Sequence, residues 1–210
     1  MANDQSSHLG MRPVKQPFGN IKIGYYRANT GAALFRYQPV ALNNSGQVQI
    51  AAILDMSGIL GSIVGFTDAN KASIPDFMDS LSEAPYMTAL PGANAWVAVA
   101  DDPNQLFIME EDTGGTIIGS ANSSGTTVSF TYIATTGNTT TGVGNALIDR
   151  STMAADTGGI LTLVGPADNM NPDGTSNDVT LAYAKWYVRI NSHQNGPLNL
   201  APVGGIGLPG

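Results

Sequence analysis

Two short acidic runs are the first candidates for catalytic residues in this chain. Asp101 and Asp102 form the first run, and residues 110–112 (Glu-Glu-Asp) form the second, one strand length further on. Two carboxylates flanking a sugar are the catalytic pair of a glycosidase. However, Asp101-Asp102-Pro103-Asn104 has the composition of an Asx or type I turn, and the second run lies just before Gly114-Gly115. We therefore favour turn and surface positions for both runs.

Other residues that support catalysis are scarce. The two histidines, His8 and His193, do not neighbour a plausible nucleophile–carboxylate set, and the chain has no G-x-S-x-G motif and no phosphate-binding P-loop. Cysteine is absent, which excludes a thiol nucleophile, a disulfide framework, Cys-ligated zinc and an iron–sulfur cluster. We therefore expect a protein that is not an enzyme and needs no cofactor.

One segment resembles the first half of a calcium-binding loop. Asn169, Asn171 and Asp173 stand at loop positions one, three and five, and Gly174 stands at position six. The bidentate Glu that the loop needs at position twelve is replaced by Thr180. We interpret this segment as a long polar loop and expect no metal site.

The composition points to a β-rich protein that assembles with others. Of 210 residues, 42% are hydrophobic and only 12% are charged, with 9 Lys and Arg against 16 Asp and Glu, whereas an ordinary domain has about 25% charged residues. The acidic balance argues against nucleic-acid binding. No apolar run reaches the ~20 residues of a membrane span, and the polar start of the chain is no signal peptide. We expect synthesis in the cytoplasm and a surface that is buried largely against neighbours.

Short apolar or alternating segments separated by turn residues predict the fold class. Strands are indicated in residues 21–26, 39–42, 48–54, 59–66, 95–100, 106–110, 126–134, 160–164 and 185–190. A Ser cap, an early Pro and helical spacing predict one short helix over 73–82. The prediction is an all-β protein with a β-sandwich or barrel core of short antiparallel strands and one short helix. Trp96 and Trp186 lie in strand segments, so we expect both in the core, with stacking on a glycan as the alternative.

The chain divides into an arm, a core and a tail. The sequence predicts an extended N-terminal arm over residues 1–20 and an extended Gly/Pro-rich tail over residues 195–210. Between them it predicts a β-rich core over residues 21–194, which can be divided at about residue 100 into 21–100 and 101–194. Both ends keep apolar residues that a solvated linker would not need. These are the candidate contacts to a capsid or to another subunit: Met11, Val14, Phe18, Leu198, Leu200, Val203, Ile206 and Leu208.

Four stretches, in order, resemble a family of structural proteins of tailed bacteriophages. The first is residues 96–107, in which a strand, an Asp-Asp-Pro-Asn turn and a Leu-Phe strand follow one another. The others are residues 33–40 with 59–66, the Thr-rich segment 139–152, and 184–194 with its Asn-x-His-Gln end. The resemblance covers residues 21–194, whereas the segment around 166–178 and the tail after Gln194 are additions to the family pattern.

The resemblance implies a capsid decoration, or cement, protein. Such proteins bind the outer surface of the major-capsid-protein lattice and stabilise the head, often as trimers. The implied partners are the major capsid protein and other copies of this chain as a homotrimer, and the implied location is the exterior of the virion after synthesis in the bacterial host. The alternative is a host-surface-binding component of a tail or head fibre.

Overall fold

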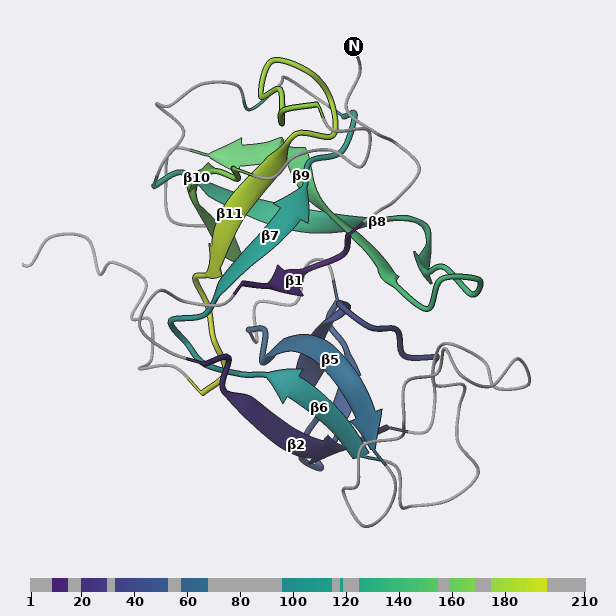
Figure 1. Cartoon of the computed structure of the whole chain (residues 1–210). Coiled ribbons are helices and arrows are strands. Elements are labelled where there is room, and N and C mark those ends of the chain that lie inside the picture. Colours follow the sequence, from purple (N-terminus) through teal and green to yellow (C-terminus); the bar gives the residue numbers. More distant parts are fainter. Residues whose placement is uncertain are drawn as a thin grey trace, which may run out of the picture.

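The structure is a computed structural model of the chain, and its described residues form two antiparallel β-sheets packed together (Figure 1). It describes residues 9–14, 20–29, 33–52, 58–67, 96–114, 118, 125–154, 159–168 and 175–195. The all-β fold class predicted from the sequence is confirmed over this part of the chain. The helix predicted over 73–82 lies outside it. Within the same residues no helix is long and apolar enough to cross a membrane.

The five-stranded sheet forms the lower half of Figure 1. Its strands, in spatial order, are β2 (Ile23–Arg27), β6 (Trp96–Ala100), β5 (Gly61–Thr67), β3 (Pro39–Leu42) and β4 (Val48–Ile50). A parallel bridge between Ala28 and Val48 joins the two outer strands at one end, so the sheet curls around its own core. That core is Ala28, Leu34, Val40, Val48, Leu60, Ile63, Phe66, Val97 and Val99.

The loop between β3 and β4 shows how a local sequence forms a hairpin. The Oδ1 atom of Asn43 accepts hydrogen bonds from the backbone N–H groups of Ser45 and Gln47, at 2.9 Å each. Gly46 follows with a φ of 72°, a left-handed conformation that glycine adopts without steric cost. The Asn-Asn-Ser-Gly sequence therefore closes the loop by its own side-chain hydrogen bonds.

The six-stranded sheet forms the upper half of Figure 1. Its order is β1 (Arg12–Pro13), β7 (Leu106–Glu110), β11 (Lys185–Ile190), β10 (Leu161–Pro166), β8 (Thr127–Gly137) and β9 (Gly144–Ala154). Alternate residues of the strands point inward, as Trp186, Val188 and Ile190 do on β11. A parallel bridge between Glu111 and Ile148 joins the end of β7 to β9, so this sheet also curls around its core.

The chain changes from one sheet to the other near residue 100. All strands from 23 to 100 belong to the five-stranded sheet, and all from 106 to 190 belong to the six-stranded one. The short strand β1 differs, because it joins the six-stranded sheet beside β7 although it precedes β2 in the chain. The folded core thus begins before residue 21, with part of the segment that the sequence predicts to be an arm.

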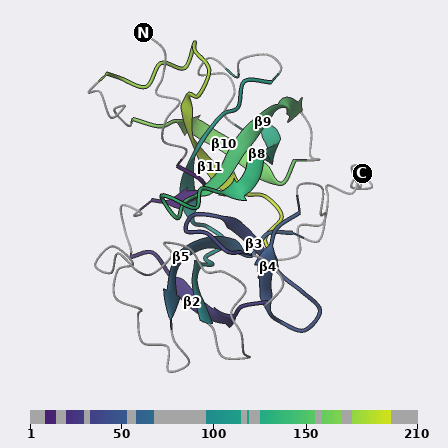
Figure 2. The ribbon, with the colours of Figure 1, turned by 90° about the vertical axis from the view of Figure 1, so that its right-hand side faces the viewer.

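Among the described residues, three connections besides the chain crossing from β6 to β7 join the two sheets, which Figure 2 shows one above the other. Met11 N–H donates to the Tyr37 carbonyl at 2.7 Å, just before β1. The tip of the β8–β9 hairpin reaches residue 36, whose N–H donates to the Gly142 carbonyl and whose carbonyl accepts from Gly144. The third connection is the segment after β11, where Ile59 pairs with His193. The two sheets are therefore joined at several places that lie far apart along the chain.

The hairpin connection depends on a glycine. A Cβ atom added to Gly137 would overlap the ring of Phe35. The Phe35 ring thus packs directly on the backbone of β8, close to the hairpin tip. Any larger residue at position 137 would push the two segments apart.

The two tryptophans have different environments. Trp186 is fully buried in the core of the six-stranded sheet, as predicted. Trp96 is only partly buried, and the guanidinium of Arg27 lies 5.7 Å from its ring centroid. The prediction for Trp96 is wrong because alternation places Val97 and Val99 in the core and turns Trp96 to the opposite face.

Candidate functional site

The first acidic run forms the predicted turn. The N–H of Asn104 donates to Asp102 Oδ1 at 2.8 Å, which is an Asx turn, and the N–H of Gln105 donates to the Asp102 carbonyl at 2.9 Å. Asp101, by contrast, is buried, with 5% of its surface exposed. The turn interpretation therefore holds for Asp102, and the surface interpretation fails for Asp101.

The second acidic run is also more buried than the sequence suggests. Glu110 and Glu111 are buried, and only Asp112 has the expected turn role, accepting from the N–H of Gly114 at 3.2 Å. A surface position is wrong for the two glutamates. The physical reason is the bridge from Glu111 to Ile148, which turns the end of β7 inward, where a local sequence pattern cannot reveal the covering strand.

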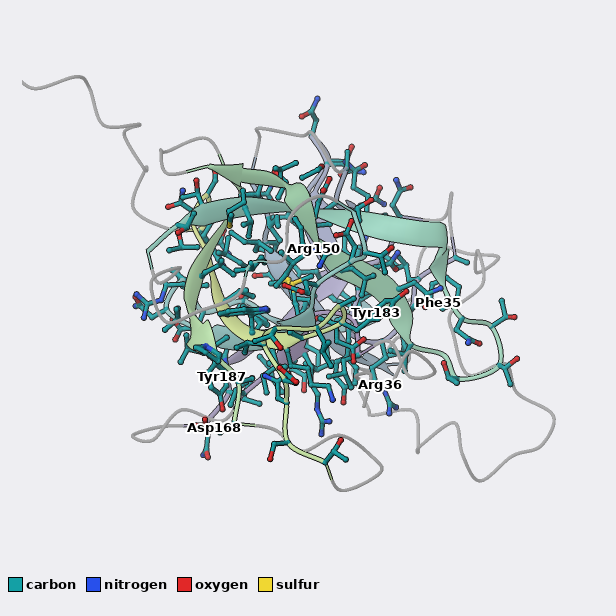
Figure 3. All side chains as sticks on the ribbon, turned by 90° about the horizontal axis from the view of Figure 1, so that it is seen from above. Phe35, Arg36, Arg150, Asp168, Tyr183 and Tyr187 are labelled. Carbon is teal, nitrogen blue, oxygen red and sulfur yellow. The ribbon has the colours of Figure 1, made fainter. Side chains whose placement is uncertain are left out.

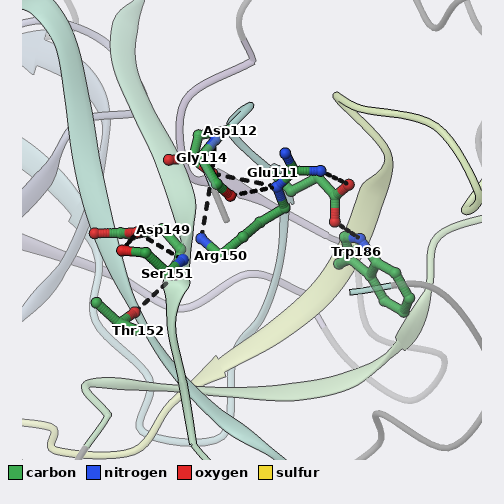
Figure 4. Close-up of polar contacts among 8 residues, drawn as sticks. All are labelled: Glu111, Asp112, Gly114, Asp149, Arg150, Ser151, Thr152 and Trp186. Carbon is green, nitrogen blue, oxygen red and sulfur yellow. Dashed lines mark hydrogen bonds and ion pairs between the residues drawn. The ribbon is translucent and has the colours of Figure 1, made fainter. Parts of the chain in front are cut away.

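Glu111 is the centre of a buried polar cluster, shown in Figure 4. One carboxylate oxygen, Oε2, accepts from the indole N–H of Trp186 at 3.1 Å, and the other, Oε1, accepts from Nη1 of Arg150 at 3.3 Å. The Nε–H of Arg150 donates to the Gly114 carbonyl at 2.8 Å and lies 3.5 Å from Asp112 Oδ1. The cluster therefore joins β7, β9 and β11, three strands that are distant in sequence.

Burial governs the electrostatics of this cluster. It raises the pKa of Glu111 to about 7, although the nearby Arg150 guanidinium and the Trp186 indole favour the ionised form. Burial also raises the pKa of Asp112, opposed mainly by the hydrogen bond from the Arg150 backbone. The ion pair thus offsets only part of the cost of removing Glu111 from water.

The geometry of the acidic runs does not suit glycoside hydrolysis. The first run directly follows β6 and the second run ends β7, so the turn at 102–105 and the five residues of β7, which span about 16 Å, lie between them. Catalytic carboxylates of glycosidases are about 5–9.5 Å apart. Glu111 is moreover fully buried, and Figure 3 shows Arg150 among the packed side chains, unlike Asp168 at the periphery. We conclude that the Glu111–Arg150 pair has a structural role.

A second polar cluster lies where the two sheets meet. The hydroxyl of Tyr26 donates to Asp101 Oδ2 at 2.5 Å and accepts from the side-chain amide of Asn195 at 3.3 Å. The backbone N–H of Asn195 in turn donates to His193 Nδ1 at 3.0 Å. Burial and the Asp101 hydrogen bond raise the pKa of Tyr26 to about 12. The cluster thus ties the end of the β11 segment to β2 and to the end of β6.

The hydrogen bond to His193 Nδ1 fixes the tautomer of the ring. Because Nδ1 accepts, the proton of the neutral imidazole sits on Nε2, and that nitrogen has no lone pair to offer a metal. Burial lowers the pKa of His193, against the attraction of the Asp101 and Asp102 carboxylates. Over the part of the chain that the structure describes, no three His, Cys, Asp or Glu side chains form a metal-binding group.

The segment 169–174, with the calcium-loop pattern, lies outside the described residues. Its neighbour Thr180, at the twelfth loop position, donates from both its N–H and its hydroxyl to Asp178 Oδ1. Thr180 therefore has a local turn role on the described side of that loop.

The predicted contact residues are only partly within the described structure. Met11 is fully buried in the core of this chain, so its side chain cannot contact a capsid or another subunit in this fold. Val14 is partly buried, and its N–H donates to the Leu106 carbonyl at 2.9 Å. The remaining predicted contacts lie outside the described residues: Phe18, Leu198, Leu200, Val203, Ile206 and Leu208.

Sequence reasoning missed the role of Gln194. Its side-chain Oε1 accepts from the Leu42 N–H at 2.7 Å, and its Nε2 donates to the Leu42 carbonyl at 3.3 Å. Its own N–H donates to the Ile59 carbonyl at 3.0 Å. The amide therefore holds β3 of the other sheet as a neighbouring strand would. The only signal was its place in the Asn-x-His-Gln end of the resembling stretch.

Comparisons of the chain with models of protein families, with curated proteins and with solved structures find no match.

Proposed function

We propose that this chain is a capsid decoration protein of a tailed bacteriophage, which binds the outer surface of the major-capsid-protein lattice and stabilises the head. The observation that carries the proposal is the ordered resemblance of four stretches of the sequence to that family. The all-β fold and the small number of charged residues agree with a protein whose work is binding.

The structural roles of two of these stretches support the proposal. Residues 96–107 form β6, the crossing turn and the start of β7, which link the two sheets. Residues 184–194 form β11 and the inter-sheet contacts of His193 and Gln194. The resembling residues thus belong to the framework that fixes the two sheets, which is the part that relatives with different loops would share.

The physical mechanism would be binding energy summed over many sites. A protein that binds only the assembled shell stabilises it by mass action, and repeated contacts on a lattice add avidity.

Copy number in purified particles tests this function. Particles of the phage that encodes the chain should contain it in an amount comparable to the major capsid protein, as measured by quantitative mass spectrometry. Particles lacking it should melt at a lower temperature and recover on addition of the purified chain. A handful of copies per particle, lost together with the tail, would instead indicate the alternative of a host-binding tail or fibre component.

A further inference from the structure

Exposed apolar side chains concentrate on strands at the ends of the sheets. The large hydrophobic residues most exposed among the described residues are Ile23 (43%), Tyr25 (43%), Val164 (40%) and Met153 (38%). Ile23 and Tyr25 lie on β2, a terminal strand of the five-stranded sheet, and Met153 lies on β9, a terminal strand of the six-stranded sheet. Residues 111–112 cover the outer edge of β9 at 148–150, and Met153 lies beyond that stretch. A terminal strand with exposed apolar side chains is a template for pairing with another strand.

The edge formed by β2 is positively charged. Within the described residues β2 is paired with β6 along its length, and its other side has only the single bridge at Ala28. Lys22, Ile23, Tyr25 and Arg27 are all exposed. This edge therefore combines two apolar side chains with a cation at each end.

The edge formed by β9 is negatively charged. Asp149, Ser151 and Met153 alternate along its partly or fully exposed side, while Arg150 points inward to Glu111. Asp112 lies close enough for the Asp149 carboxylate to help raise its pKa, so two acids share this region. Arg150 lies 3.5 Å from Asp112 but is shared with Glu111, so one guanidinium faces three carboxylates in this region.

Charge is distributed unevenly along the whole sequence in the same sense, with cations near the N-terminus and acids in the rest. Residues 5–54 contain five of the nine cations and no acidic residue, which gives them a charge of +5. Because the chain carries −7, the rest carries −12. Two copies therefore attract each other when the N-terminal quarter of one meets the acidic part of the next.

We propose that β2 of one copy docks against β9 of a second copy, so that subunits associate head to tail. Figures 1 and 2 place β9 in the upper sheet and β2 in the lower one, and the two strands do not pair within a chain. Pairing of β2 with β2 would be antiparallel and would set Lys22 against Arg27 of the other copy, which is repulsive. A repeated head-to-tail contact whose rotation closes forms a ring, of which a trimer is one case. The proposal concerns the free protein, so it stands or falls independently of capsid binding.

Cysteine cross-linking tests this contact, and the native chain has no cysteine to interfere. Two single variants, Tyr25→Cys and Met153→Cys, are purified separately, mixed and oxidised. We expect a cross-linked species in the mixture and little in either variant alone. The matched control mixes Tyr25→Cys with Val164→Cys, which is equally exposed but lies on β10, a strand with a neighbour on each side. This control should not cross-link.

A second measurement covers the case in which the geometry does not permit a disulfide. Sedimentation of the native chain should show an oligomer, and Tyr25→Lys should shift it toward the monomer, whereas Val164→Lys should not. Melting curves establish that each variant is folded. Cross-linking of Tyr25→Cys with itself, equal effects of both Lys variants, or a native chain that sediments only as a monomer would each overturn the proposal. A monomeric chain present at high copy number in particles would refute this contact and leave the decoration function intact.

Discussion

The two polar clusters differ in the direction in which burial shifts the pKa of their central group. In the six-stranded sheet, the Glu111 carboxylate faces a guanidinium and still has a pKa raised to about 7. At the junction of the sheets, His193 lies near two carboxylates and still has a lowered pKa. In both places burial outweighs the opposite charge, so each group prefers its neutral form. Because one group is an acid and the other a base, the clusters respond to acid in opposite directions.

The signs follow from linkage between protonation and folding. The folded pKa of Glu111 is above its ordinary value of 4.5, so its contribution to stability is fully present below about 4.5 and is lost as the pH rises through about 7. The folded pKa of His193 is below 6.5, so its contribution is present above 6.5 and is lost as the pH falls through the folded value. Acid therefore favours the cluster inside the sheet and weakens the one between the sheets.

The largest expected effect comes from removing the apolar part of the first cluster. Trp186→Ala deletes a fully buried ring and leaves Glu111 Oε2 without its indole donor. The free energy of unfolding should fall by about 3–5 kcal/mol. Urea titration followed by far-ultraviolet circular dichroism measures it.

Trp96→Ala is the matched control, because the same ring is removed from a partly exposed position beside Arg27. It should cost about 1 kcal/mol. Equal losses of unfolding free energy in the two variants would contradict the assignment of Trp186 to the core and of Trp96 to a partly exposed position.

A smaller effect is expected from removing the cation of the first cluster. Arg150→Met leaves Glu111 buried without its main opposing charge, which should raise the pKa of that carboxyl further. The loss of stability should be about 3 kcal/mol at about pH 8 and clearly less at about pH 5, where Glu111 can take up a proton. Urea titrations at both pH values give the difference.

Glu111→Gln supplies the control for this pH dependence. In the native chain the slope of stability with pH arises partly from Glu111, whereas the amide of the variant cannot titrate and can still accept from the Trp186 indole. Adding Arg150→Met to Glu111→Gln should therefore cost the same at both pH values. A pH-dependent cost in that double variant would assign the dependence to another group.

The sequence predicted the features that depend on local patterns. Alternation located most strands, and Asp102 formed the expected turn because its hydrogen bonds are made within a few residues, as are those of Asn43. The burial of Glu110 and Glu111 could not be read in this way. It depends on strand β9, which follows some 35 residues later and closes over the end of β7.

The same limit applies to the ends of the chain. Met11 looked like a contact residue of an arm that contains several prolines. Its backbone is instead bonded to residues 37 and 62, and its side chain belongs to the core of the six-stranded sheet. Likewise, nothing near Gln194 indicates that Leu42 supplies its partner, 152 residues away. Among the described residues, the contacts between the sheets are therefore the part of the structure that the sequence predicts least.

The smallest expected effect concerns the junction cluster and tests the opposite sign. Protonation of His193 puts a hydrogen on Nδ1, which then can no longer accept from the Asn195 N–H. A hydrogen bond of this kind contributes about 1 kcal/mol. His193→Asn keeps an acceptor oxygen near the position of Nδ1 and cannot be protonated. The variant should thus lose packing at about pH 7.5 but should not lose further stability on acidification to about pH 5, where the native chain weakens. Because Glu111 titrates in both proteins, the difference in unfolding free energy between them isolates His193. If that difference stays constant from neutral to acid pH, the imidazole does not control the junction, and the contrast between the two clusters reduces to Glu111 alone.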